Sequence, residues 1–217
     1  MVMQISNILN IPYNNQVHTQ IAIQAQDPKW QESFWYLCGP SSLQMALAYF
    51  GLADTSTATA KAIAQNVLVD PNTSDGRCTS WMKIISYLKT GFGITSEFKA
   101  TKLTFAEIKN NVDANYPILT GISFNLPPNE NGETNEIGHI VTIIGYIAPD
   151  IVVVNDSFGS EITPRVVNEV IYYNWDNRNA PPSNRPKNNG NQVKYKYSAF
   201  FEILSDKWLA FTSIPKK

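Results

Sequence analysis

The chain has 217 residues and a formal net charge of −1, and 43% of its residues are hydrophobic, which is the composition of a globular protein. Lys and Arg form no basic patch, so we expect no nucleic-acid partner. The sequence contains neither a run of about 18 apolar residues nor a signal-peptide pattern, so we expect no membrane span and, by default, a cytoplasmic protein. The length predicts one domain over 1–217, with a helical half at about 30–115 and a sheet half at about 116–217.

The N-terminal part of the sequence predicts a strand followed by a helix. Apolar and polar residues alternate over Gln16–Gln24, which is the pattern of a half-buried strand. After Cys38, apolar residues recur at helical spacing as far as Phe50. Pro40 suits the first turn of such a helix and Gly51 suits its end. Cys38 is therefore expected at the N-terminus of a helix.

Further helices are predicted before residue 116 and strands after it. Thr57–Val67 and Thr79–Leu88 have helical patterns, and the capping box of Thr104 and Glu107 opens a short helix. The predicted strands are Pro117–Phe124, His139–Tyr146, Ile151–Asn155, Lys194–Leu204 and Trp208–Ile214. A turn around Pro149 makes the second and third of these strands a hairpin. Helices followed by strands predict an α+β architecture.

Three positions carry the predicted chemistry. The dipole of a helix that begins at Cys38 favours the thiolate, which is the reactive form of cysteine. His139 opens an apolar strand, where its ring can take the thiol proton and later return it. Asn155 or Asp156 ends the next strand, and a side-chain oxygen there can accept a hydrogen bond from the second ring nitrogen. The order along the chain is that of papain-type enzymes.

The segments around these positions resemble the bacteriocin-processing, double-glycine leader peptidases and their peptidase-like relatives. LCGPSSLQMALAYFG is similar to the nucleophile helix of that family, GHIVTIIGY to its His strand and IVVVNDSFG to its Asp strand, where Ser157 stands in place of the usual Pro. The resemblance covers Gln31–Gly51 and Gly138–Gly159. It implies a papain-like α+β fold, in which the nucleophile helix packs on an antiparallel β-sheet.

The same resemblance implies the role of each site residue. Cys38 is the nucleophile, His139 the base and Asp156 the orienting acid, with Asn155 as the alternative third member. Gln31 is the side chain that helps to hold the oxyanion, together with the backbone N–H of Cys38.

Other residues are expected to form the groove or to be incidental. Trp35, Tyr36, Gly138 and Asn155 are candidates for the wall of the substrate groove. The second cysteine, Cys78, is interpreted as structural or incidental. The cysteines and histidines lack the spacing of a zinc site, and no phosphate-binding glycine loop is present, so we expect no metal and no cofactor.

The sequence therefore predicts a cysteine peptidase that hydrolyses peptide or protein amide bonds through a thioester acyl-enzyme. Two alternatives stay open. An acyltransferase, transglutaminase-like enzyme or deamidase uses the same triad with another acceptor or substrate, and a catalytically silent peptide-binding module keeps the groove alone.

Overall fold

A computed structural model describes residues 6–28, 36–69, 78–125, 136–158, 162–167, 170–175 and 190–215. The α-helices in these ranges are α1 Gln16–Gln26, α2 Cys38–Tyr49, α3 Thr57–Val67, α4 Trp81–Phe92, α5 Phe105–Asp113 and α6 Tyr197–Ile203. The strands are β1 Ser6–Ile8, β2 Thr95–Lys99, β3 Ile118–Asn125, β4 Glu136–Ile147, β5 Ile151–Asn155, β6 Ile162–Val167, β7 Val170–Trp175, β8 Val193–Lys196 and β9 Leu204–Ser213.

One antiparallel sheet organises the molecule. Its strands follow the order β2-β9-β3-β4-β5-β8, and β1 adds to β4 as a seventh strand. β3 and β4 lie at the centre, in a register that places Ile122 opposite His139. β4 and β5 pair antiparallel across the turn at Pro149, which confirms the predicted hairpin. β6 and β7 form a separate two-stranded sheet.

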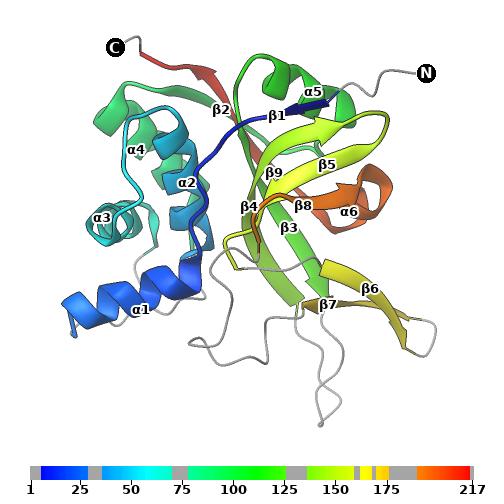
Figure 1. Cartoon of the computed structure of the whole chain (residues 1–217), viewed down its shortest axis with the longest axis horizontal. Coiled ribbons are helices and arrows are strands. Elements are labelled where there is room, and N and C mark those ends of the chain that lie inside the picture. Colours follow the sequence, from blue (N-terminus) through cyan, green and yellow to red (C-terminus); the bar gives the residue numbers. More distant parts are fainter. Residues whose placement is uncertain are drawn as a thin grey trace.

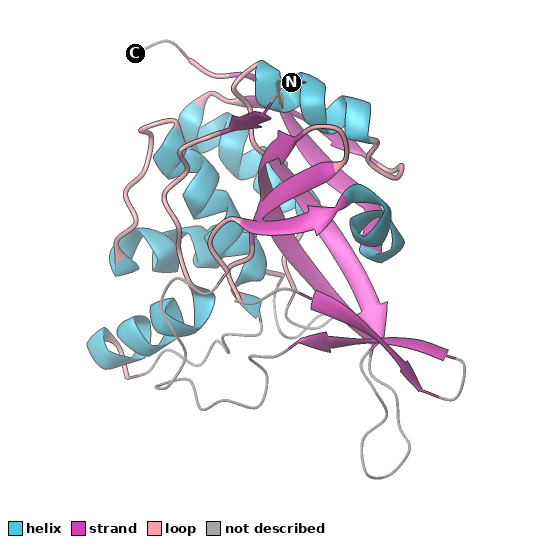
Figure 2. Cartoon of the chain, turned by 45° about the vertical axis from the view of Figure 1, so that its right-hand side comes forward, coloured by secondary structure: helices cyan, strands magenta, loops and turns pink. Residues whose placement is uncertain are grey.

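Helices cover both faces of the large sheet (Figure 1). α2, α3 and α4 pack on one face, where Leu47 and Leu88 meet Leu119 of β3. α5 and α6 pack on the other face, and Figure 2 shows the strands between the two helical layers. Burial of both faces explains why β3 and β4 read as nearly continuous apolar runs. The predicted α+β architecture, with the helix that begins at Cys38 packed on an antiparallel sheet, is confirmed.

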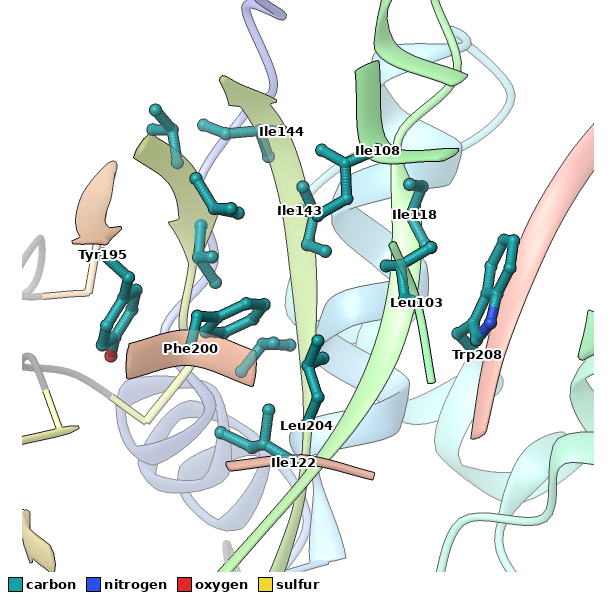
Figure 3. Close-up of a cluster of buried hydrophobic side chains, with 14 of the residues drawn as sticks. Leu103, Ile108, Ile118, Ile122, Ile143, Ile144, Tyr195, Phe200, Leu204 and Trp208 are labelled. Atoms are coloured by element: carbon teal, nitrogen blue, oxygen red, sulfur yellow. The ribbon is translucent and has the colours of Figure 1, made fainter. Parts of the chain in front are cut away.

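The largest apolar cluster lies on the face that α5 and α6 cover. Figure 3 shows Ile108 of α5 and Phe200 of α6 against Ile122 and Ile143 of the two central strands. Trp208 of β9 closes the cluster on its far side. Each fully buried side chain of this size contributes roughly 1.5–3 kcal/mol to stability, so this cluster fixes β3 and β4, the strands that lead to the site.

Most predicted helices occur close to their predicted positions. α3 has the predicted bounds, and the capping box of Thr104 and Glu107 opens α5 as expected. α4 begins two residues later than predicted, because the Ser80 hydroxyl caps it, and it ends at Gly93 in a left-handed conformation that suits glycine. None of the helices in the described ranges has the length and apolar character needed to cross a bilayer.

The strand predicted over Gln16–Gln24 is wrong, because these residues belong to the helix α1. Asn15 caps the helix by accepting hydrogen bonds from the N–H groups that follow it. Val17 and Ile23 are buried, whereas Ile21 is 42% exposed. The alternating apolar residues therefore lie on different faces of a helix rather than on one face of a strand.

The C-terminal strands are only partly as predicted. Of the residues 194–204, only the first few continue β8, and the chain then turns into α6. Phe200 and Ile203 are buried at helical spacing in the main core, which favours the helix over a continued strand. The short strands β1 and β2 were not predicted. Both belong to the large sheet, although they precede residue 116, where the sheet half was expected to begin.

We predict that Asn15→Ala lowers the free energy of unfolding by about 1 kcal/mol, because the first turn of α1 loses its cap. The measurement is urea unfolding monitored by circular dichroism. Asn15→Ser, which keeps a capping oxygen, should recover most of the loss. Equal destabilisation by both substitutions would contradict the capping role.

Candidate active site

Cys38 is the first residue of α2, and its thiol lies at the positive end of the helix dipole. The residue is 8% exposed. The next residue, Gly39, packs directly against Thr79, and an added Cβ would lie 2.2 Å from the Thr79 hydroxyl oxygen. Only glycine lets the segment before α4 approach the helix terminus this closely.

His139 and Asp156 meet across the β4–β5 hairpin. Nε2 of His139 lies 2.7 Å from Oδ1 of Asp156, and the side chains are 3% and 1% exposed. The same Oδ1 accepts a hydrogen bond of 2.8 Å from the N–H of Phe158, whose ring packs edge-on against the imidazole. Because Nε2 is engaged by Asp156, Nδ1 is the nitrogen left for the hydrogen bond between His139 and Cys38. The structure thus brings the three predicted residues together in one relay.

Asn155 does not take part in this relay. Its side chain is fully buried, and Oδ1 accepts a hydrogen bond of 3.0 Å from the N–H of Gln192. Successive residues of a strand point to opposite sides, so only one of the pair Asn155 and Asp156 can face His139. The expectation that Asn155 lines the substrate groove is therefore wrong, and its carboxamide instead holds the turn before β8.

Two buried hydrogen bonds fix α2 relative to β4. The hydroxyl of Ser42 donates to the carbonyl of Ile140 at 3.0 Å, and the hydroxyl of Thr142 donates to the carbonyl of Ser42 at 3.3 Å. Ser42 lies one turn after Cys38, and Ile140 follows His139. These bonds therefore set the separation between the thiol and the imidazole.

The backbone of Asp156 is held from two further segments. Its carbonyl accepts a hydrogen bond of 2.8 Å from the Tyr13 hydroxyl, and its N–H donates to the carbonyl of Gly190 at 2.9 Å. Burial and the charge of Asp156 raise the pKa of Tyr13, so the phenol stays a donor. The next residue, Ser157, donates 2.7 Å to Oε1 of Gln16 at the start of α1. The Ser found where the family has Pro thus joins this turn to α1.

The electrostatics of the relay favour a thiolate beside an imidazolium. Burial raises the pKa of Cys38, but the hydrogen bond and charge of His139, with backbone hydrogen bonds from Ile140 and Gly39, outweigh it and lower the pKa below its ordinary value. Burial lowers the pKa of His139, but the charge and hydrogen bond of Asp156, followed by those of Cys38, raise it well above its ordinary value. Both shifts widen the pH range in which the ion pair exists.

A cavity of about 330 Å³ opens beside the thiol, between the helical layer and the sheet. Cys38, His139, Tyr36 and Gly138 line it. Asp156 is not part of its wall and acts on the cavity only through His139. Gln31 and Trp35, predicted for the oxyanion site and the groove, lie outside the described residues.

The cavity wall also contains residues that the sequence did not indicate. Cys78 is exposed and lines the cavity together with Cys38, and neither forms a disulfide. Thr79 lies beside them because α4 begins only at Trp81. The signal that was missed is Ser80, a capping residue that excludes the two preceding residues from the helix. The described residues contain no group of three or more His, Cys, Asp or Glu side chains that could hold a metal ion.

A comparison with known protein families identifies the family of the chain. The model of the Peptidase C39-like family matches residues 8–180. The chain belongs to the Peptidase C39-like family. The match includes Cys38, His139 and Asp156 and confirms the resemblance drawn from the three motifs. The C-terminal strand β9 follows the matched region.

One similar solved structure is a double glycine motif protease from an AMS/PCAT transporter, in complex with the leader peptide. It is 12% identical, with a TM-score of 0.49, and the alignment covers 97% of this chain and 95% of that chain. No curated protein matches the sequence.

We predict that Cys38 is alkylated with a midpoint below the pH of roughly 8.5 expected for a free thiol. The thiolate reacts, so a lowered pKa moves the rise in rate to lower pH. The measurement is the rate of iodoacetamide addition by intact mass between about pH 4 and 10, in a Cys78→Ser background so that one thiol is followed.

The control is His139→Ala, in which burial of the thiol remains but its cationic partner is lost. The midpoint should then rise, and labelling at neutral pH should slow by about 10-fold or more. A midpoint near 8.5 that His139→Ala leaves unchanged would show that the thiol is not activated.

Proposed function

We propose that this chain is a cysteine peptidase in which Cys38, His139 and Asp156 form the catalytic triad. The observation that carries the proposal is the relay itself: a thiol at a helix N-terminus, hydrogen-bonded to an imidazole whose other nitrogen lies 2.7 Å from a buried carboxylate. Membership of the Peptidase C39-like family supports it. The relay suits attack on a carbonyl carbon, because it supplies a nucleophile, a proton donor and a fixed tautomer.

The proposed reaction has two halves. The Cys38 thiolate adds to the amide carbonyl, and the C–N bond then breaks as His139 gives its Nδ1 proton to the leaving amine. This leaves a thioester and a neutral imidazole, which still donates Nε2–H to Asp156. His139 next takes a proton from water, the hydroxide attacks the thioester, and the C–S bond breaks to release a carboxylic acid and Cys38.

The tetrahedral intermediates need donors for the oxyanion. The N–H of Cys38 lies at the N-terminus of α2, where backbone N–H groups have no partner within the helix. Gln31 remains the proposed side-chain donor, on the basis of the family motif alone.

The cavity rim offers backbone groups suited to an extended peptide. Backbone hydrogen bonds of 2.8 Å and 3.0 Å, formed by Cys78 and Ser80, flank the isolated bridge between Leu68 and Thr79. In an antiparallel pair, a residue between two such bonds turns its own N–H and C=O away from its partner. Among the described residues nothing hydrogen-bonds to these two groups of Thr79, and its buried hydroxyl also has no partner. A substrate main chain would pair with the two backbone groups of Thr79, which supports a peptide rather than a compact small molecule.

We predict that the triad variants separate by role in a screen with fluorogenic peptides. Cys38→Ala should abolish hydrolysis, and His139→Ala should lower kcat/KM by roughly 10²–10⁴-fold, since the general acid and base is lost. Asp156→Asn should lower kcat by less, because the imidazole loses its charge partner but stays in place.

His18→Ala is the matched control, because the chain has two histidines and His18 lies on α1, away from the cavity. It should keep full activity. An acyl-enzyme that forms at Cys38 but turns over only when an amine is added would identify a transferase instead of a peptidase. A folded wild type that neither hydrolyses any peptide nor reacts readily with iodoacetamide at Cys38 would favour a silent binding module.

The next test uses a series of peptides based on the best-cleaved sequence, each with one backbone amide N-methylated. We predict that methylation raises KM by about 5- to 10-fold at a single position, where it removes the hydrogen bond to Thr79. The measurement is steady-state kinetics on the methylated series. Thr79→Val removes the hydroxyl but keeps the backbone groups, and it should preserve the pattern. A series without any sensitive position would contradict main-chain pairing at Thr79.

A further inference from the structure

A bulge in β9 brings chain into the cavity wall. Thr120 of β3 pairs with Trp208, but Ile122 pairs with Leu204, so a single residue of β3, Gly121, faces three residues of β9. Extra residues in one strand leave the ladder and bend that strand, a device common beside active sites. The bulged residues are 205–207, and two of them line the cavity.

Gly121 is what allows the bulge to lie here. A Cβ at this position would sit 2.4 Å from Oγ of Ser205 and 3.4 Å from the carbonyl oxygen of Lys207. The Ser205 hydroxyl also accepts a hydrogen bond of 3.2 Å from the N–H of Lys207, which holds the bulge in shape. Glycine on β3 and serine on β9 therefore fit together, and the side chain that they place at the cavity is Lys207.

Lys207 gives the cavity its charge. Among the described lining residues it alone carries a charge that does not depend on the relay, and none is acidic. The neighbouring Asp206 is exposed and is not part of the wall. Lys207 forms no ion pair with any described residue. A cation in a peptide cavity without an acidic partner is free to meet an anionic group on a ligand.

The order of the strands gives the span between the segment that carries this cation and the strand that carries His139. β9 lies two strands from β4, with β3 between them. Neighbouring strands are about 4.8 Å apart and an extended chain advances about 3.3 Å per residue, so β9 runs roughly 10 Å from β4, which is a span of about three residues of extended peptide.

We propose that Lys207 forms a subsite for a carboxylate and selects peptides that carry one two or three residues from the bond that Cys38 attacks. The proposal rests on the proposed peptidase function for the site and adds its substrate class. The carboxylate belongs either to an acidic side chain or to a free C-terminus. β9 follows the region matched by the family model, so Lys207 lies outside the matched residues.

The test measures binding, so that it does not depend on turnover. The protein is the Cys38→Ala variant, and the probes are fluorescein-labelled hexapeptide pools with Glu, Gln or Lys fixed at one position and mixed residues elsewhere. We expect the Glu pool to bind about five-fold more tightly than the Gln pool at one position. Each pool is made with a free and an amidated C-terminus to separate the two sources of the carboxylate.

Variants at Lys207 decide the assignment. Lys207→Gln should remove the preference, and Lys207→Glu should reverse it toward the Lys pool. The matched control is Lys194→Glu on β8, an exposed lysine at the far edge of the sheet, which should leave the preference unchanged. Circular dichroism verifies that each variant is folded.

Three outcomes would overturn the proposal: no preference for acidic pools at any position, a preference that survives Lys207→Gln, or no binding of any pool by folded protein. A clear preference combined with a wild type that hydrolyses nothing would instead support the subsite and refute the peptidase function. Hydrolysis without charge preference would refute the subsite alone.

Discussion

The buried contact between His139 and Asp156 is the interaction on which the rest of the candidate site depends. Taking a carboxylate and an imidazolium out of water costs several kcal/mol for each ion, and these side chains are only 1% and 3% exposed. The cost is offset by their bond of 2.7 Å, by the N–H of Phe158 and by the thiolate of Cys38 on the far side of the ring. Asp156 stabilises the imidazolium of His139, and the imidazolium in turn stabilises the thiolate of Cys38, so the state of the thiol depends on a carboxylate that it does not touch.

The backbone holds this relay in place from several parts of the chain. The Ser42 hydroxyl joins α2 to β4 one turn after the thiol. Tyr13, from the N-terminal part of the chain, and Gly190, from the C-terminal part, form hydrogen bonds with the backbone of Asp156. An added Cβ at Gly190 would lie 1.8 Å from the carbonyl oxygen of Asp156, so the approach requires glycine. These anchors come from α2, from the segment between β1 and α1 and from the turn before β8, so the geometry of the site depends on contacts between distant parts of the chain.

Local signals in the sequence predicted the parts of the site that local structure determines. The Gly-Pro pair after Cys38 indicates a helix start, and the apolar run after His139 indicates a buried strand, so both positions were predictable. The choice of Asp156 over Asn155 came from the family motif and not from local signals, because it depends on which side chain at the end of β5 faces His139. α1 was missed because its capping residue was not weighed against an alternating pattern. The position of Lys207 in the cavity wall could not be predicted, because it depends on the pairing of β9 with a glycine more than 80 residues away.

One buried oxygen of Asp156 bears on the proposed peptidase function. Oδ2 of Asp156 is buried and has no hydrogen-bond partner among the described residues, so the carboxylate is only partly satisfied. Such a group costs stability. This carboxylate cannot contribute directly to peptide binding, because Asp156 does not line the cavity. Its effect there is exerted on the proton of His139 and, through it, on the thiol of Cys38. Under the proposed peptidase function this cost accompanies activation of the thiol, which a groove that only binds peptides does not need.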